Sequence, residues 1–122
     1  MDSYRIMVID DEKIVGNMAK LSLELDGYMV ETFLNAGLAL DRLKEQKFDV
    51  VVTDLVMTGI DGVEVVRTVD KLYPETKVII ITAFANIDTV LSTLEAEIHD
   101  CFPKPVKMRE LKESIHRALK KG

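Results

Sequence analysis

The chain has 122 residues, a formal net charge of −5 and a single cysteine. The length fits one domain over residues 1–122, and a composition that is 48% hydrophobic and 30% charged is typical of globular proteins. One cysteine excludes an internal disulfide and a paired-cysteine metal site, so a reducing, cytoplasmic compartment is expected. No secretory signal is expected, because Met1–Arg5 lacks a basic flank and a long apolar region, and no apolar stretch approaches the ~20 residues of a membrane span. An acidic chain without basic and aromatic patches also predicts no direct binding of nucleic acid.

Five short segments have the composition of β-strands. Three of them are apolar at nearly every position, which suits strands buried on both faces of a parallel sheet. Two are expected at or near an edge, one because apolar and polar residues alternate and the last because Pro103 lacks an amide hydrogen. In chain order the expected strands are Ile6–Ile9, Met29–Phe33, Val50–Asp54, Lys77–Ile81 and Asp100–Phe102.

Five further segments have helical periodicity and alternate with the strands: Glu12–Asp26, then 35–46, 61–73 and 86–98, and Met108–Lys121. In the first of them Ile14, Met18, Leu21 and Leu25 recur at helical spacing, which predicts that they form its buried face. Asn35 and Asp61 are placed to cap the second and third helices. The inward positions expected in the other helices are Leu38, Ala39 and Leu43; Val65, Val66, Val69 and Leu72; Ile87, Val90, Leu91, Leu94 and Ile98; and Leu111, Ile115 and Leu119.

This alternation predicts an α/β fold. Strands separated by helices pair in parallel through right-handed crossovers, so a five-stranded doubly wound sheet with five helices is expected. We take the strand order 2-1-3-4-5 by precedent from such sheets and not from the residues themselves. In that order the first and third strands are neighbours.

Polar residues follow four of the expected strands and would meet at one edge of the sheet. Asp10 and Asp11 end the first strand, Asp54 the third, Thr82 the fourth and Lys104 the fifth. Each has an ordinary alternative when taken alone. Asp11 could cap the following helix, a threonine at a strand end commonly satisfies backbone groups, and a lysine is usually a solvated charge. The joint placement is the specific signal.

Three carboxylates within a few ångströms repel one another, and a hard divalent cation with oxygen ligands resolves that repulsion. Mg²⁺ suits one or two carboxylates together with water and phosphate oxygens. With Lys104 as a positive charge and Thr82 as a hydroxyl donor, the cluster predicts phosphoryl transfer to Asp54 as nucleophile, which yields an acyl phosphate.

Over essentially its whole length the chain resembles the receiver domains of bacterial two-component response regulators, whose fold is flavodoxin-like. The motifs are Val8–Glu12, Thr53–Met57, Gly59–Gly62, Ile81–Ala83 and Lys104-Pro105. The resemblance implies that Asp54 is the phosphoacceptor, and that Thr82 and Lys104 hold the phosphoryl group. It also implies that Asp11, Asp54 and the backbone carbonyl of Val56 bind Mg²⁺, with Asp10 acting through water. It further implies a cis Lys104-Pro105 peptide, and a histidine kinase or phosphotransfer protein as donor.

The chain departs from the family pattern where Thr58 replaces the usual proline and where Cys101 replaces the usual switch aromatic, for which Phe84 could partly substitute. Val56 and Phe84 are apolar and cannot orient an attacking water, so slow hydrolysis of the acyl phosphate is expected.

The resemblance implies an output surface on the fourth helix, fifth strand and fifth helix, which would contact an effector domain or target protein. Residues 87–100 contain four acidic and no basic side chains, and residues 107–121 are mostly basic. A two-fold homodimer that pairs these segments is one arrangement, and two ordinary solvated faces are the alternative.

Two rival functions predict different residues at the site. A degenerate receiver would bind proteins without taking phosphate, and it predicts the loss of site residues that are all present here. An aspartate-dependent hydrolase needs a second acid–base carboxylate, but Val56 stands two residues after Asp54. No separate substrate is expected to turn over.

Overall fold

The computed structural model describes residues 3–56, 62–83, 88, 92, 94 and 96–120. Strands and helices alternate along these residues from β1 to β4, and β5 and α5 complete the described elements. Their bounds are β1 Arg5–Ile9, α1 Lys13–Leu25, β2 Met29–Phe33, α2 Ala36–Glu45, β3 Val50–Asp54, α3 Gly62–Leu72, β4 Lys77–Thr82, β5 Asp100–Pro103 and α5 Met108–Leu119. The helix expected over 86–98 and the cap expected at Asp61 lie wholly or largely outside the described residues.

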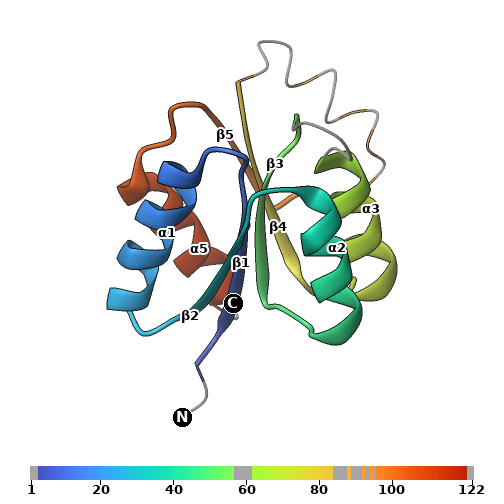
Figure 1. The fold of residues 1–122 in the computed structure, drawn as a ribbon, viewed down its shortest axis with the longest axis horizontal. Helices are drawn as coiled ribbons and strands as arrows, with labels where there is room; N and C mark the ends of the chain where they lie inside the picture. Colours follow the sequence, from blue (N-terminus) through green and yellow to red (C-terminus); the bar gives the residue numbers. More distant parts are fainter. Residues whose placement is uncertain are drawn as a thin grey trace.

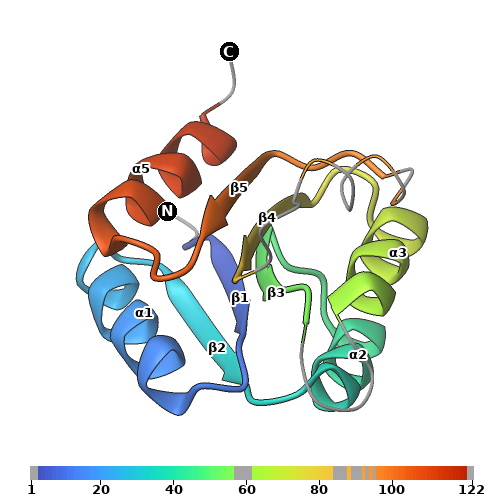
Figure 2. The same cartoon turned by 90° about the horizontal axis from the view of Figure 1, so that it is seen from above.

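All five strands pair in parallel in one sheet of order β2-β1-β3-β4-β5, as predicted. Helices α1 and α5 cover one face of the sheet, and α2 and α3 cover the other (Figure 1). Seen from above, the same arrangement shows the three layers of a doubly wound α/β domain (Figure 2). The order places β1 beside β3, which brings the ends of these two strands together.

The core has two halves, one on each side of the sheet. Alternate residues of the central strands point to opposite faces, so Ile6 and Val8 pack toward α1 and α5 while Met7 and Ile9 pack toward α2 and α3. The buried helical residues include Leu43 in α2, three of the four valines of α3 (Val65, Val66 and Val69), and Leu111 and Ile115 in α5, as expected. No described helix has the length and apolar character that a membrane crossing requires.

The predicted buried face of α1 is wrong. Ile14, Met18, Leu21 and Leu25 are between 56% and 79% exposed, and the side facing the sheet is formed by Gly16, Ala19 and Leu23. These three residues also recur at helical spacing. Two of them are small, so the helix can lie close to the sheet, and a Cβ on Gly16 would meet Thr32 at 3.6 Å. Hydrophobic periodicity therefore predicts the presence of α1 correctly, but it predicts the wrong buried side.

Two further inward positions are also wrong. Leu38 in α2 is 54% exposed and Leu72 at the end of α3 is 45% exposed. Other positions of each helix face the protein core. In α2 the buried residues are Ala36, Ala39 and Leu43. The cap at Asn35 is confirmed, because its side chain accepts a hydrogen bond of 2.9 Å from the backbone amide of Leu38.

Candidate functional site

The carboxyl ends of β1 and β3 form the centre of the site. Strand register pairs Ile9 with Thr53, so Asp10, which follows β1, lies at the same level of the sheet as Asp54, the last residue of β3. On the next strands Asp54 is level with Ile81, and Thr82 with Pro103. Asp10, Asp54 and Thr82 therefore come together with Lys104 at one edge of the sheet, the upper one in Figure 1.

The Lys104 ammonium lies among three carboxylates. Its Nζ is 2.7 Å from Asp54 Oδ2, 3.0 Å from Asp10 Oδ2 and 2.9 Å from Glu12 Oε1. Burial lowers the pKa of this amine, but the hydrogen bonds to Asp54, Glu12 and Asp10 outweigh burial and hold the pKa above its ordinary value. Lys104 is therefore a permanent positive charge that balances part of the negative charge of the cluster.

Asp54 is 4% exposed, and both of its carboxylate oxygens are hydrogen-bonded. Oδ1 accepts a hydrogen bond of 3.0 Å from the backbone amide of Val56, and Oδ2 faces Lys104. The backbone amide and the ammonium fix the orientation of the carboxylate. The chain after Asp54 then returns to α3, where the Gly62 amide donates to the Leu55 carbonyl at 3.0 Å.

Asp10 is the most enclosed acid of the cluster. Burial raises the pKa of its carboxyl, opposed by hydrogen bonds from the Glu12 amide and from Lys104. Its Oδ1 accepts from the Glu12 amide at 2.8 Å and thereby orders the start of α1. Its Oδ2 is buried and accepts no hydrogen bond, although the Lys104 ammonium is close to it. A buried carboxylate oxygen with a free lone pair is suited to a cation or to a water bound to one.

The acidic residues fit a hard divalent cation. Carboxylate oxygens of Asp10, Asp11 and Glu12 lie within 4.8 Å of one another, and Asp11 and Glu12 are exposed. Asp54 faces the same depression, which Asp11, Glu12, Val56 and Thr82 also line. An all-oxygen donor set that is open to solvent on one side suits Mg²⁺, which keeps several of its waters.

Glu12 is the site residue to which sequence reasoning gave no role. Its carboxylate is 62% exposed, yet it pairs with Lys104. The signal was present in the run of three acids at the end of the first strand, but Glu12 also fits the start of a helix, where acids are common.

Thr82 ends β4 as predicted, fully buried, and its carbonyl accepts from the Lys104 amide at 2.9 Å. The Lys104-Pro105 peptide is cis, which confirms the expectation. Cys101 is half-buried in β5 beside the core under α2 and α3. Thr58 and Phe84 lie outside the described residues.

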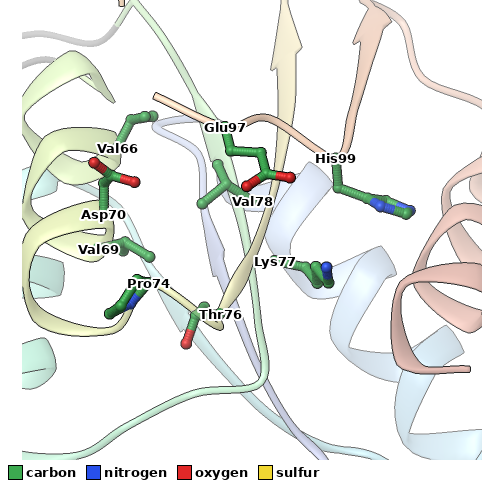
Figure 3. Close-up of a pocket in the computed structure, with 9 residues that line it drawn as sticks. All are labelled: Val66, Val69, Asp70, Pro74, Thr76, Lys77, Val78, Glu97 and His99. Carbon is green, nitrogen blue, oxygen red and sulfur yellow. The ribbon is translucent and has the colours of Figure 1, made fainter. Parts of the chain in front are cut away.

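A second pocket lies at the amino ends of β4 and β5, beside α3 (Figure 3). Val66, Val69 and Val78 form its floor, and Asp70 and Glu97 stand at its rim. The His99 ring points away from these valines (Figure 3), and its Nε2 lies 3.2 Å from the Ser114 carbonyl oxygen. Among the described residues, the only group of three or more acidic, histidine or cysteine side chains placed to bind a metal is at residues 10–12, far from this pocket.

The fold and the site together define a doubly wound α/β domain with a lysine and an acidic cluster at the carboxyl edge of its sheet. The model of the response regulator receiver domain family matches residues 6–116. The chain belongs to this family, and it is therefore a receiver domain of the kind found in two-component response regulators.

Two relatives illustrate the similarity. The chain is 31% identical over 122 residues to the uncharacterized transcriptional regulatory protein YkoG of Bacillus subtilis, covering all of this chain and 54% of YkoG. It is 30% identical over 119 residues to the response regulator MprA of Mycobacterium tuberculosis, covering 98% of this chain and 52% of MprA. The chain thus spans about half the length of the curated relatives it matches.

Solved structures show the same fold. A CheY-like receiver domain protein from Methanospirillum hungatei superposes with a TM-score of 0.88 at 29% identity, covering 95% of this chain and 93% of that one. The response regulator TrrA of Thermotoga maritima, solved in complex with Mg²⁺ and BeF, gives a TM-score of 0.82 at 32% identity and covers 95% and 99% of the two chains.

Proposed function

We propose that this domain accepts a phosphoryl group on Asp54 from a histidine kinase or a phosphotransfer protein. The observation that carries the proposal is the environment of Asp54. Its carboxylate is nearly buried at the end of β3, held by the Val56 amide at 3.0 Å and by the Lys104 ammonium at 2.7 Å, and still faces an open depression.

In the proposed reaction, a carboxylate oxygen of Asp54 forms the new bond to phosphorus while the bond from phosphorus to the donor atom breaks. The product is an acyl phosphate, and the donor leaves with the electron pair of the broken bond. Lys104 stays protonated and offers its charge to the transferred oxygens, and the Thr82 hydroxyl is the proposed second donor. Both residues act by positioning and charge balance, which is most of what phosphoryl transfer requires.

Asp10, Asp11, Asp54 and the Val56 carbonyl are the residues we propose to hold Mg²⁺. Support comes from the unbonded oxygen of Asp10 and the oxygen-rich donor set. TrrA, a similar receiver, was solved with this ion. When bound, the ion offsets negative charge on the phosphoryl oxygens.

We also propose that the phosphorylated state is long-lived and that the domain turns over no separate substrate. Val56 is 51% exposed at the rim of the depression and has no polar group with which to orient a water. The domain would then act as a stoichiometric switch that assists its own phosphorylation and its own slow dephosphorylation.

The proposed output is a changed surface on α5, β5 and the segment before β5, read by an effector or by a second copy of the chain. Within one protomer Arg117 already forms an ion pair with Asp100 at 3.1 Å. This ion pair reduces the contrast expected between the acidic residues 87–100 and the basic residues 107–121. YkoG is named a transcriptional regulatory protein, which favours an effector that acts on transcription. The expected lack of nucleic-acid binding, and a cytoplasmic location, are proposals for these 122 residues only.

The test is intact mass after incubation with Mg²⁺ and a small acyl-phosphate donor, run beside Asp54→Asn. The proposal predicts one added phosphoryl group on the parent chain, which does not form when Mg²⁺ is omitted from the incubation and is absent from the variant. A folded parent chain that binds Mg²⁺ but gains no mass would instead indicate a module that works without phosphorylation.

A further inference from the structure

The three protons of the Lys104 ammonium are all in use. They serve three carboxylates: Asp54 Oδ2 at 2.7 Å, Glu12 Oε1 at 2.9 Å, and the two oxygens of Asp10 at 3.0 and 3.2 Å. The same ammonium is the proposed partner of the phosphoryl oxygens. A phosphoryl donor that reaches Asp54 therefore meets a lysine that must release a partner before it can bind a new oxygen.

Burial decides which partner can give way while the donor approaches. The Asp10 side chain is fully buried and that of Asp54, still a carboxylate at that stage, is 5% exposed, so release would leave either one as an unpaired charge out of water. Such a loss corresponds to a factor on the order of a hundred or more in an equilibrium constant. The Glu12 side chain is 62% exposed, and its return to water corresponds to a factor of only about two to five. Glu12 is therefore the partner that Lys104 can release.

The backbone of Glu12 does not have to move for this release. Its amide donates to Asp10 Oδ1 at 2.8 Å, and its carbonyl accepts from the amides of Val15 and Gly16 in the first turn of α1. Glu12 is the N-cap residue of that helix, yet its side chain caps none of the helix amides. Rotation of the side chain alone thus breaks the contact with Lys104 and leaves the start of α1 intact.

Charge favours the same exchange. Glu12 and Lys104 both line the depression that Asp54 faces. A phosphoryl group brings negative oxygens into this depression, and these oxygens attract the Lys104 ammonium and repel the Glu12 carboxylate. Before the phosphoryl group arrives, the ion pair between Glu12 and Lys104 stabilises the unmodified site.

We propose that Glu12 is a positioning residue of the unmodified site: it holds Lys104 until an oxygen of the incoming phosphoryl group takes its place. This inference rests on the proposed function of Asp54. Because the contact is lost in the exchange, Glu12 disfavours both the transfer from a small donor and the phosphorylated state. Removal of its charge should therefore tighten the binding of a phosphoryl-like anion, whereas the loss of a merely structural residue would weaken it.

Beryllium fluoride, which takes the place of a phosphoryl group on a carboxylate, is the equilibrium probe. Its dissociation constant is measured in saturating Mg²⁺, after the Mg²⁺ affinity of each variant has been determined. Glu12→Gln keeps the length of the side chain and removes its charge, so it should bind the probe about threefold more tightly than the parent chain. Its phosphorylation by a small acyl-phosphate donor should be faster by a similar factor. A Glu12→Gln chain that binds the probe as the parent chain does, or more weakly, overturns the inference.

Two variants separate the contact with Lys104 from negative charge in general. Glu12→Asp keeps the charge, but its side chain is one methylene shorter and loses the contact, so it should also bind beryllium fluoride more tightly than the parent chain. Glu24→Gln removes an exposed acid near the other end of α1 and should leave the dissociation constant unchanged. If Glu12→Asp matches the parent chain, or if Glu24→Gln matches Glu12→Gln, the effect does not come from the contact and the inference is overturned.

Failure of the proposed function gives a different result. A parent chain that gains a phosphoryl group on Asp54, with Glu12→Gln behaving identically, leaves the proposed function standing and removes only the role of Glu12. A parent chain that binds no beryllium fluoride and gains no mass removes the proposed function and this inference with it. Urea unfolding of the two Glu12 variants shows whether each is folded as the parent chain is.

Discussion

At the scale of the residue, the positive charge of Lys104 offsets the negative charge of the site. One ammonium with three donors faces three carboxylates, two of them nearly buried. Each buried acid would be costly without it, because a carboxylate removed from water needs a partner. A phosphoryl group on Asp54 would add negative charge where the Lys104 ammonium is already in place.

Gly62 is the residue whose lack of a side chain fixes the loop after Asp54. A Cβ there would overlap the Asp54 carbonyl oxygen and lie 2.7 Å from the Leu55 Cα, both of which are backbone atoms that cannot rotate away. We expect Gly62→Ala to lower the free energy of unfolding by about 2–3 kcal/mol, since overpacked sites typically lose 1–3 kcal/mol. Urea unfolding of the parent chain and of Gly62→Ala measures this difference in the free energy of unfolding.

The matched control is Gly16→Ala in α1, where the added Cβ makes ordinary contacts with Thr32 at 3.6 and 3.7 Å. Alanine is favoured over glycine in a helix by up to about 1 kcal/mol, so this variant should lose no stability. Equal losses in the two variants would show that the close approach at Gly62 is not the cause.

Cys101 is expected to be an unreactive thiol. Burial, followed by the nearby charges of Asp100 and Asp88, raises the pKa of this thiol to about 11. Because the thiolate is the nucleophile, alkylation by iodoacetamide should be slow at neutral pH and should still be rising steeply at about pH 10. A rate that levels off near the ordinary thiol value of 9.0 would contradict the assigned environment.

At the scale of the element, hydrophobic periodicity gave the presence of each described helix, but for α1 it did not give the buried side. Two sets of residues in α1 share helical spacing, and the larger, more apolar set faces solvent. Which side of a helix faces the sheet depends on the space between them. The small residues Gly16 and Ala19 let α1 lie close to β2. The sequence shows the two candidate sets but not the depth of the space beneath the helix.

The contact between β2 and α2 predicts a pH dependence of stability. Arg42 donates two hydrogen bonds to Glu31, at 2.8 and 3.0 Å, and they lower the pKa of that carboxyl despite its partial burial. A carboxyl with a lowered pKa stabilises the fold above its ordinary value of 4.5, and that contribution is lost as pH falls through the lowered pKa.

The parent chain should therefore lose more stability than Glu31→Gln between about pH 6 and about pH 3, by less than about 1 kcal/mol because the pair is partly exposed. Glu64→Gln, at an exposed position of α3, is the control and should follow the parent chain. Urea unfolding at the two pH values measures the difference. An identical loss in the parent chain and in Glu31→Gln would exclude this ion pair as its source.

At the scale of the whole molecule, the topology turns scattered polar residues into one site. Asp10, Asp54, Thr82 and Lys104 are far apart in sequence and meet because all of their strands are parallel. Their convergence could be predicted once the strands and their order were assumed. The ion-pair partners of Lys104 could not be predicted from the sequence. Its contact with Glu12 depends on the path of the chain into α1 and on rotamers that a sequence pattern does not specify.

The acidic cluster predicts stabilisation by Mg²⁺. An ion that binds only the folded chain raises the free energy of unfolding by about 1.4 kcal/mol at tenfold over its dissociation constant. We expect a concentration-dependent rise in melting temperature that a chelator reverses and that Asp11→Asn weakens. Asp41→Asn, at an exposed acid on α2, should keep the full rise. No rise in the parent chain, or one that Asp41→Asn removes equally, would place the ion elsewhere.

The central claim, that Asp54 takes the phosphoryl group, is tested most directly by locating the modified residue. Borohydride reduces an aspartyl phosphate to homoserine, so peptide mass spectrometry after Mg²⁺-dependent phosphorylation and reduction identifies the acceptor position. The account predicts homoserine at position 54 alone. Modification at Asp10, at Asp11 or at an acid away from the sheet edge, with Asp54 intact, would contradict it.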